Sequence, residues 1–316
     1  MLIINLISFL ISCIVLIISG TLLVKTLAKI AAFLKLSEFV VGFIIMAFAT
    51  SIPELFVGIT SALTKNPALA LGNVIGANII NLTLVIGIAI LLGKGIKIES
   101  KKTKTDALYM VGIAALPMVL MVIGGSLSRI DGIILLAAFA LYARRILQQR
   151  KLFKKEVEDS IKRKDIILTT ILFVFSLALL FLSARFVVEY ATSLSVDLAL
   201  PPIIVGLFII SIGTTLPELT FGSRAVLAGH SEMALGNSIG SVIVNSTLVL
   251  GIVSIIHPIT ANILLFSVSA IFMVVVAFLF ATFVESGNKL YVKEGISLIL
   301  LYIFFVIIEF YIKVIY

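Results

Sequence analysis

The chain has 316 residues, of which 61 % are hydrophobic and only 13 % are charged, and its mean hydropathy is +1.27. This composition excludes an ordinary soluble domain, whose apolar fraction is about 45–50 %. A net charge of +8 could suggest nucleic acid as a partner, but the placement of the basic residues makes nucleic acid a poor candidate.

Ten apolar segments follow one another along the chain, many of them at or near the roughly 20 residues that an α-helix needs to cross a bilayer. They cover residues 2–24, 37–64, 67–93, 106–124, 130–147, 166–190, 201–228, 231–256, 260–284 and 291–313. The first is too long for a signal-peptide core and lacks a basic leader, so we expect it to be retained. The predicted fold class is an all-α polytopic membrane protein with ten transmembrane helices.

The basic residues are divided unequally between the two sides on which ten crossings place the loops. One side collects 20 of the 24 Lys and Arg residues, whereas the other holds only Lys65, Arg129, Arg185 and Lys313. Cytoplasmic loops carry an excess of Lys and Arg. We therefore expect a multi-pass plasma-membrane protein in a lipid bilayer, with both termini outside.

A single long polar segment, 144–165, divides the chain into a first half, 1–143, and a second half, 166–316, of five predicted spans each. The charge distribution makes this segment a cytoplasmic linker. At about twenty residues it is too short to form a regulatory domain.

A stretch in the first half, 42–87, recurs without a gap as 206–251. Aligning residues 41–90 with 205–254 gives 22 identities in 50 positions, and these include Gly, Pro, Asn and Glu residues. Halves with an odd number of spans insert in opposite orientations. The duplication thus predicts two inverted five-helix repeats, an architecture of transporters whose site lies at the midplane.

Each copy of the repeat has a Pro-Glu pair in the middle of an apolar span. Pro53 and Pro217 lack an N–H group and clash with the carbonyl four residues earlier, so we expect kinks and released backbone carbonyls before them. Free carbonyls at membrane depth require a polar partner such as a cation or water.

Polar side chains surround each Pro-Glu pair at helical spacing. Hydroxyl residues three and four positions before each glutamate share its helix face, and the following span carries three positions four apart, all of them polar except Ala77. The first set is Thr50, Ser51 and Glu54 with Asn73, Ala77 and Asn81; the second is Thr214, Thr215 and Glu218 with Asn237, Ser241 and Asn245.

Glu54 and Glu218 are the only two of the 16 acidic residues that stand in mid-span. A charge at that depth costs about 2.5–3.5 kcal/mol on the insertion scale, and no Lys or Arg occupies the middle of a span.

Two converging carboxylates hold a proton or bind a cation. Oxygen ligands without thiol or imidazole indicate a hard cation, and calcium suits flexible oxygen geometry best. The alternative is a structural kink whose glutamate bonds a neighbouring helix, which the repetition disfavours.

The paired elements, of the forms Gly-Thr-Ser-x-Pro-Glu and Gly-Asn-x-x-Gly-Ser, resemble the α-repeats of the calcium/cation antiporter superfamily, in particular its prokaryotic sodium/calcium exchanger branch. The resemblance implies an alternating-access antiporter that expels calcium against sodium, with the first and sixth spans as a gate. It implies calcium carboxylates at Glu54 and Glu218, and carbonyl or hydroxyl ligands at Ala47, Thr50, Ser51, Ser211, Thr214 and Thr215. It also implies a polar floor at Asn81 and Ser241, and Asn73, Asn237 and Asn245 complete the predicted site.

Three positions depart from the family pattern. Ala77 replaces a serine and removes a sodium ligand, Asn245 replaces an aspartate, and Ala49 replaces a glycine. The site therefore has two carboxylates where that branch has three. We expect calcium binding to survive, whereas the sodium stoichiometry and the choice of sodium over protons stay open.

Sodium/calcium exchange is the first expectation. Proton/calcium exchange and a passive cation channel are the alternatives, and flux without a counter-ion gradient would identify a channel. We expect no enzyme activity, because no nucleophile–base pair or metalloprotease motif is present. Cys13, His230 and His257 are not at metal-ligand spacing, so we expect no cofactor, and no obligate protein partner is predicted.

Overall fold

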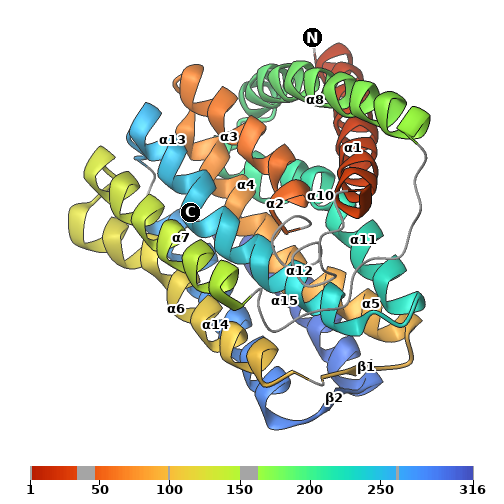
Figure 1. Cartoon of the computed structure of the whole chain (residues 1–316). Helices are drawn as coiled ribbons and strands as arrows, with labels where there is room; N and C mark the ends of the chain where they lie inside the picture. The colour runs from red at the N-terminus through yellow and green to blue at the C-terminus, as the bar shows by residue number, and fades with distance from the viewer. Residues whose placement is uncertain (1, 34–46, 99, 150–162, 261–262, 316) are drawn as a thin grey trace.

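The structure is a computed structural model that describes residues 2–33, 47–98, 100–149, 163–260 and 263–315. It is almost entirely helical (Figure 1). The first half contains α1 (Leu2–Phe33), α2 (Ala47–Thr50), α3 (Ile52–Leu63), α4 (Pro67–Ile80), the π-helix η2 (Asn81–Val85), α5 (Ile86–Leu92), α6 (Lys101–Gly124) and α7 (Arg129–Gln149). The second half contains α8 (Arg163–Asp197), α9 (Pro202–Ile204), η4 (Val205–Ile210), α10 (Ser211–Thr214), α11 (Leu216–Leu227), α12 (Ser231–Val244), η5 (Asn245–Val249), α13 (Leu250–Ile256), α14 (Ile263–Ser286) and α15 (Val292–Ile315).

The helices around the repeated stretch begin and end at equivalent residues in the two halves. The bounds of α2, α3, α4, η2 and α5 recur in α10, α11, α12, η5 and α13, in the same register that aligns the two sequences. The equivalence therefore extends from the residues to the backbone, including the change from α-helix to π-helix.

Among the described residues, seven helical stretches are long and apolar enough to cross a membrane. The bent pair formed by α9–α10 and α11 makes an eighth if it counts as one span. The short α3 and the more polar α7 fall outside this set, and of the predicted span 37–64 only 47–63 is described as helix. Many large apolar side chains of the outer helices are exposed, as lipid contact requires.

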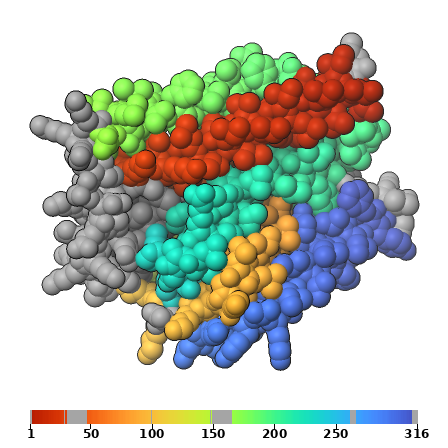
Figure 2. Space-filling model, turned by 90° about the vertical axis from the view of Figure 1, so that its right-hand side faces the viewer, coloured from red at the N-terminus to blue at the C-terminus, as the bar shows by residue number. Residues whose placement is uncertain are grey.

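Two of the longest helices form a separate layer. Figure 2 shows α1 and α8 side by side along their lengths. Their facing side chains, such as Leu16 and Leu23 from α1 and Leu180 from α8, belong to one apolar cluster. This cluster also includes residues of the underlying segments, such as Val57 of α3 and Ile210 of η4. A second, larger cluster joins the remaining long helices, and α4 and α12 are buried at its centre.

Glycines allow the two halves to approach closely at the centre. A Cβ atom on Gly72 would collide with the backbone carbonyl of Ile203, and one on Gly206 would collide with that of Leu69. Gly76 likewise meets the backbone of Leu207. Gly72 and Gly76 thus form a close small-residue contact between α4 and the α9 and η4 segments of the other half.

Two features of the connections differ from the sequence-based expectation. A short antiparallel ladder, β1 (Ile96–Lys97) with β2 (Lys289–Leu290), joins the two halves and was not predicted. Helix α7 continues to Gln149, so helix replaces the first residues of the predicted linker 144–165. Residues 34–46, which include Gly42, and residues 150–162 of the linker lie outside the described part of the chain.

Candidate ion-binding site

Both predicted kinks are present, and each lies just before its proline. Helix α2 ends at Thr50 and α3 begins at Ile52, while α10 ends at Thr214 and α11 begins at Leu216. The residues at the two breaks have almost the same conformation: Ser51 has φ −81° and ψ 0°, and Thr215 has φ −85° and ψ −3°. The second break bends its span by 40°. The missing proline N–H explains why the ladder is interrupted here.

The breaks place the two glutamates at helix N-termini. Glu54 lies in the first turn of α3 and Glu218 lies in the first turn of α11. Both side chains are completely buried. The positive end of a helix dipole stabilises a carboxylate in that position by about 0.3–1 kcal/mol, far less than the several kcal/mol that burial of an ion costs.

The four carboxylate oxygens lack hydrogen-bond partners among the described residues, and neither glutamate forms an ion pair with one of them. The carboxylates lie close enough for the charge of Glu54 to act on Glu218. Thr214 lies beside Glu54, and Thr50 lies beside Glu218. A structural kink with a satisfied glutamate does not fit these unpartnered oxygens. Two adjacent buried carboxylates of this kind require protons or a bound cation.

Reciprocal hydrogen bonds join the halves around the glutamates. The Thr50 hydroxyl lies 3.3 Å from Asn237 Oδ1 and 3.2 Å from Ser241 Oγ. The equivalent Thr214 hydroxyl donates to Asn73 Oδ1 at 3.1 Å. Each break therefore packs against the long central helix of the other half, and the asparagines hold the hydroxyl groups in place.

The backbone carbonyls near the breaks are only partly released. Ala47 O accepts a long 3.4 Å bond from Ser51 N. Ser211 O accepts from Thr215 N at 3.1 Å and from Thr215 Oγ1 at 2.6 Å. Each carbonyl oxygen has two lone pairs, so Ala47 O retains the greater capacity to bind a further group. The hydroxyl of Ser51 has no partner among the described residues.

Two asparagines begin the π-helical segments, η2 at Asn81 and η5 at Asn245. Both amide atoms of Asn81 and the Oδ1 atom of Asn245 lack partners among the described residues. All thirteen predicted site residues are buried: Ala47, Thr50, Ser51, Glu54, Asn73, Asn81, Ser211, Thr214, Thr215, Glu218, Asn237, Ser241 and Asn245. These residues supply hydroxyl, amide and carboxylate oxygens from four segments that are either broken at a proline or contain a π-helical turn. Single π-helical turns inside α-helices are frequent at functional sites.

One polar residue at the centre was missed by the sequence analysis. Asn78 of α4 is fully buried and bonds to Asn245 and Ser246 of η5. It falls outside the four-residue spacing of Asn73, Ala77 and Asn81, and its equivalent in the second half is Val242. A third asparagine within an apolar helix was the available signal.

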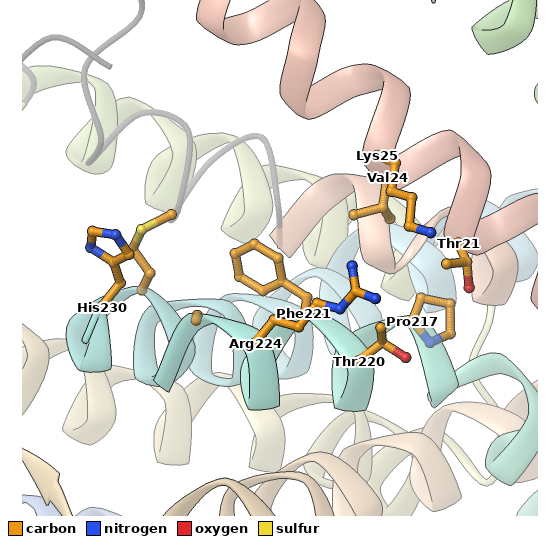
Figure 3. A pocket seen from close by; sticks show the side chains of 10 residues that line it. Thr21, Val24, Lys25, Pro217, Thr220, Phe221, Arg224 and His230 are labelled. Carbon is orange, nitrogen blue, oxygen red and sulfur yellow. The ribbon is translucent and has the colours of Figure 1, made fainter. Parts of the chain in front are cut away.

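A pocket of about 260 Å³ reaches the second break from one side. It lies between α1 and α11, with Pro217 at one end and His230 at the other (Figure 3). Lys25 and Arg224 extend their charged groups into the same part of the pocket. Pro217, which directly precedes Glu218, therefore lines this accessible pocket. Among the described residues, no group of three or more His, Cys, Asp or Glu side chains could form a conventional metal centre.

Comparison with known proteins gives a consistent result. The family model described as sodium/calcium exchanger protein matches residues 4–147 and 168–311, two ranges in the same register as the internal repeat. The sodium/calcium exchanger MaX1 of Methanosarcina acetivorans is 27 % identical over 333 residues, covering 92 % of this chain and 93 % of that protein. The inner membrane protein YrbG of Escherichia coli is 30 % identical over 251 residues, 77 % of each chain. The solved structure of the sodium-calcium exchanger NCX_Mj soaked with 100 mM Na+ and 10 mM Sr2+ matches with a TM-score of 0.69 and 26 % identity, covering 96 % of this chain and 98 % of that one.

Proposed function

The chain belongs to the sodium/calcium exchanger family, and on this premise we propose that it is a secondary active antiporter that exchanges calcium for sodium by alternating access. The observation that carries the proposal is the pair of buried, unpartnered carboxylates, Glu54 and Glu218, one from each half. The ion site lies between the halves at the membrane midplane. The bound ions are the substrates, and the site requires no resident cofactor.

The donor atoms favour calcium as one substrate. Two carboxylates supply formal charge, while Thr50, Thr214 and the amide oxygen of Asn245 supply neutral oxygens. Calcium accepts about 6–8 such oxygens in irregular arrangements, whereas magnesium requires a strict octahedron and sheds its water reluctantly. Ala47 O and the Ser51 hydroxyl complete the ligand set on the first-half side.

Charge balance limits the counter-ions. With both glutamates ionised the site carries two negative charges, which one calcium ion, two sodium ions or two protons neutralise. A third sodium ion would leave an excess charge in a medium where desolvation costs several kcal/mol per ion. Asn245 adds no charge, and Ala77 supplies no hydroxyl. We infer exchange of one calcium for two monovalent cations.

Proton/calcium exchange is the second candidate. It is favoured by the lack of hydrogen-bond partners, among the described residues, at all four carboxylate oxygens, which leaves each glutamate able to take up a proton. In that mechanism the same two side chains would carry the counter-ions, and sodium would need no ligands of its own.

We further propose that ten segments cross the membrane as two inverted five-helix repeats, 1–143 and 166–316, with both termini outside and the linker 144–165 in the cytoplasm. The repeated element bounds and the reciprocal bonds of Thr50 and Thr214 support this arrangement. So do contacts between loops that ten crossings place on one side, such as β1 with β2 on the side rich in Lys and Arg. We also propose that the membrane it crosses is the plasma membrane.

Calcium uptake into proteoliposomes tests the function. An outward sodium gradient should drive calcium accumulation, and a pH gradient of equal size without sodium should not. Uptake driven by the pH gradient alone would replace sodium exchange with proton exchange. Calcium flux that runs down its own gradient without any counter-ion would contradict an antiporter and indicate a channel.

A further inference from the structure

We propose that Asn78 is a positioning residue that holds the Asn245 amide with its oxygen directed to the ion and its nitrogen away from it. The inference rests on the proposed function, because it assigns the orientation of one ligand of the proposed site. It arises from a series of hydrogen bonds that joins α14, α4 and η5.

The series of hydrogen bonds begins at Met273, whose side chain can accept a hydrogen bond but cannot donate one. Asn78 Nδ2 donates to the thioether sulfur of Met273 at 3.4 Å and to Ser246 Oγ at 2.9 Å. A thioether has no hydrogen to donate. Met273 therefore fixes which end of the Asn78 amide faces α14, and the Oδ1 atom of Asn78 must face the other way.

The orientation of Asn78 determines that of Asn245. Asn245 Nδ2 donates to Asn78 Oδ1 at 3.2 Å, so the nitrogen of this amide is occupied. The remaining atom, Asn245 Oδ1, is buried and has no partner among the described residues. An amide torsion of this type has two nearly equivalent orientations. Without Asn78, the amide could turn and present its N–H groups, which repel a cation.

Among the described residues, the first repeat lacks an equivalent set of hydrogen bonds around its own asparagine, Asn81, and provides a comparison. The alignment of the two repeats makes Asn81 the equivalent of Asn245 and Val242 the equivalent of Asn78. Valine offers no acceptor, and both amide atoms of Asn81 lack partners among the described residues. One amide of the site is therefore fixed and the other is not, so the two halves differ in how rigidly they present a neutral ligand.

Water cannot readily take the place of the Asn78 side chain. A cavity bounded by Asn78, Ser246 and Met273 has a volume of about 10 Å³ and is mostly apolar. That is at the lower limit for a single water molecule, which also needs two or more polar partners. Loss of the Asn78 amide therefore leaves Asn245 without a substitute anchor.

The pairing also accounts for an amide rather than an ionised carboxylate at position 245. The Oδ1 atom of Asn78 needs a donor on its neighbour, and an ionised carboxylate has none. The Met273 sulfur opposes rotation of Asn78 to provide one. Asn78 and Asn245 together thus favour a neutral ligand, in keeping with a site of two negative charges.

A double-mutant cycle on calcium binding tests the inference. Binding is measured by titration calorimetry on the full-length protein for the wild type, Asn78→Leu, Asn245→Ala and the double variant. Loss of a residue that orients a metal ligand costs about 10–100-fold in affinity, so Asn78→Leu should weaken calcium binding at least tenfold. In the Asn245→Ala background, Asn78→Leu should have no further effect, because Asn78 acts only through Asn245. Losses that add in the double variant would overturn the inference.

Two further variants keep the test decisive. If Asn78→Leu does not fold, Met273→Leu removes the acceptor that fixes Asn78, and it should weaken binding in the wild type but not in Asn245→Ala. Val242→Ala is the matched control at the equivalent position and should change calcium affinity less than twofold. Weakening by Met273→Leu in both backgrounds would also overturn the proposal. Wild-type calcium affinity in Glu54→Gln would instead refute the ion site and the proposed function, so the two failures are distinguishable.

Discussion

At the scale of single residues, one pair of equivalent positions in the repeats bears on how many ions the site holds. Ser241 of α12 bonds to Thr50 across the site at 3.2 Å, whereas its equivalent in the first half, Ala77 of α4, has no hydroxyl. The candidate site therefore has a hydroxyl group on one side that it lacks on the other. Because sodium depends on neutral oxygens more than calcium does, this asymmetry should affect sodium first.

We expect Ala77→Ser to strengthen apparent sodium binding by roughly threefold to tenfold, the equivalent of about 1 kcal/mol for one added polar contact. Calcium affinity should change less, since both carboxylates remain. Sodium-dependent calcium flux, measured against sodium concentration, gives the half-saturation point. Ser241→Ala is the matched variant and should shift it in the opposite direction. Equal sodium dependence in all three proteins would remove Ala77 and Ser241 from the sodium ligands.

Most residues of the candidate site could be proposed at this scale because both glutamates, and the hydroxyl and asparagine residues around them, recur at equivalent positions of the two repeats. Polar residues that recur inside apolar spans are expensive and therefore informative. Asn78 could not be found in this way, since Val242 occupies the equivalent position. Its role depends on Met273 and Ser246, which lie far from it in the sequence and meet it only in the folded chain.

At the scale of helices, α1 contacts the helix breaks of both halves through one glycine, Gly20. A Cβ atom on Gly20 would lie 3.2 Å from Pro53 Cγ and 3.3 Å from Pro217 Cγ, closer than ordinary van der Waals contact. The same residue thus contacts the proline next to each glutamate. If α1 forms part of the gate in the proposed alternating access, it would move past these two prolines, and a glycine would allow that movement at short range.

Gly20→Ala should slow transport several-fold while leaving equilibrium calcium affinity within about threefold of wild type, because overpacking of about 1–3 kcal/mol falls on the contact and not on the ligands. Flux in proteoliposomes and binding to the purified protein separate the two effects. Gly112→Ala in α6 is the matched control, since nothing lies within 4 Å of its Cβ position. A Gly20→Ala protein as fast as Gly112→Ala would show that the close approach has no part in transport.

The seven membrane-length helical stretches of the described residues could be predicted from apolar segments, and the kinks could be predicted from Pro53 and Pro217. The π-helices η2 and η5 did not, although each begins at a predicted site residue. A π-helical turn differs from an α-helical turn by one shifted hydrogen bond. Tertiary packing around Asn81 and Asn245 determines whether that hydrogen bond shifts, so the periodicity of the sequence does not predict it.

At the scale of the whole molecule, the loops provide a test of the proposed topology. Lys65 lies between α3 and α4, and Lys94 lies between α5 and β1, so the two residues flank one predicted crossing. Both are exposed. The split of basic residues predicts that Lys65 lies outside and Lys94 lies in the cytoplasm.

Single cysteines at these positions, in a protein that also carries Cys13→Ala, should react differently in intact cells. Lys65→Cys should be labelled by a membrane-impermeant thiol reagent from outside, and Lys94→Cys should be labelled only after the membrane is permeabilised. The reverse pattern would invert the topology while keeping the repeats. Labelling of both from outside would contradict a crossing by α4 and α5, and with it the inverted repeat.

The central claim is that Glu54 and Glu218 bind one calcium ion together, each contributed by one half of the chain. Calcium binding to the purified protein, measured by titration calorimetry for the wild type, Glu54→Gln and Glu218→Gln, tests it most directly. We predict one site per chain in the wild type, competition by sodium, and a loss of affinity in each variant that is similar in size and exceeds the roughly 10–100-fold typical of an outer ligand partner. Both variants should still fold, because removal of a buried charge relieves a cost. Calcium affinity near that of the wild type in either folded variant would contradict the shared site.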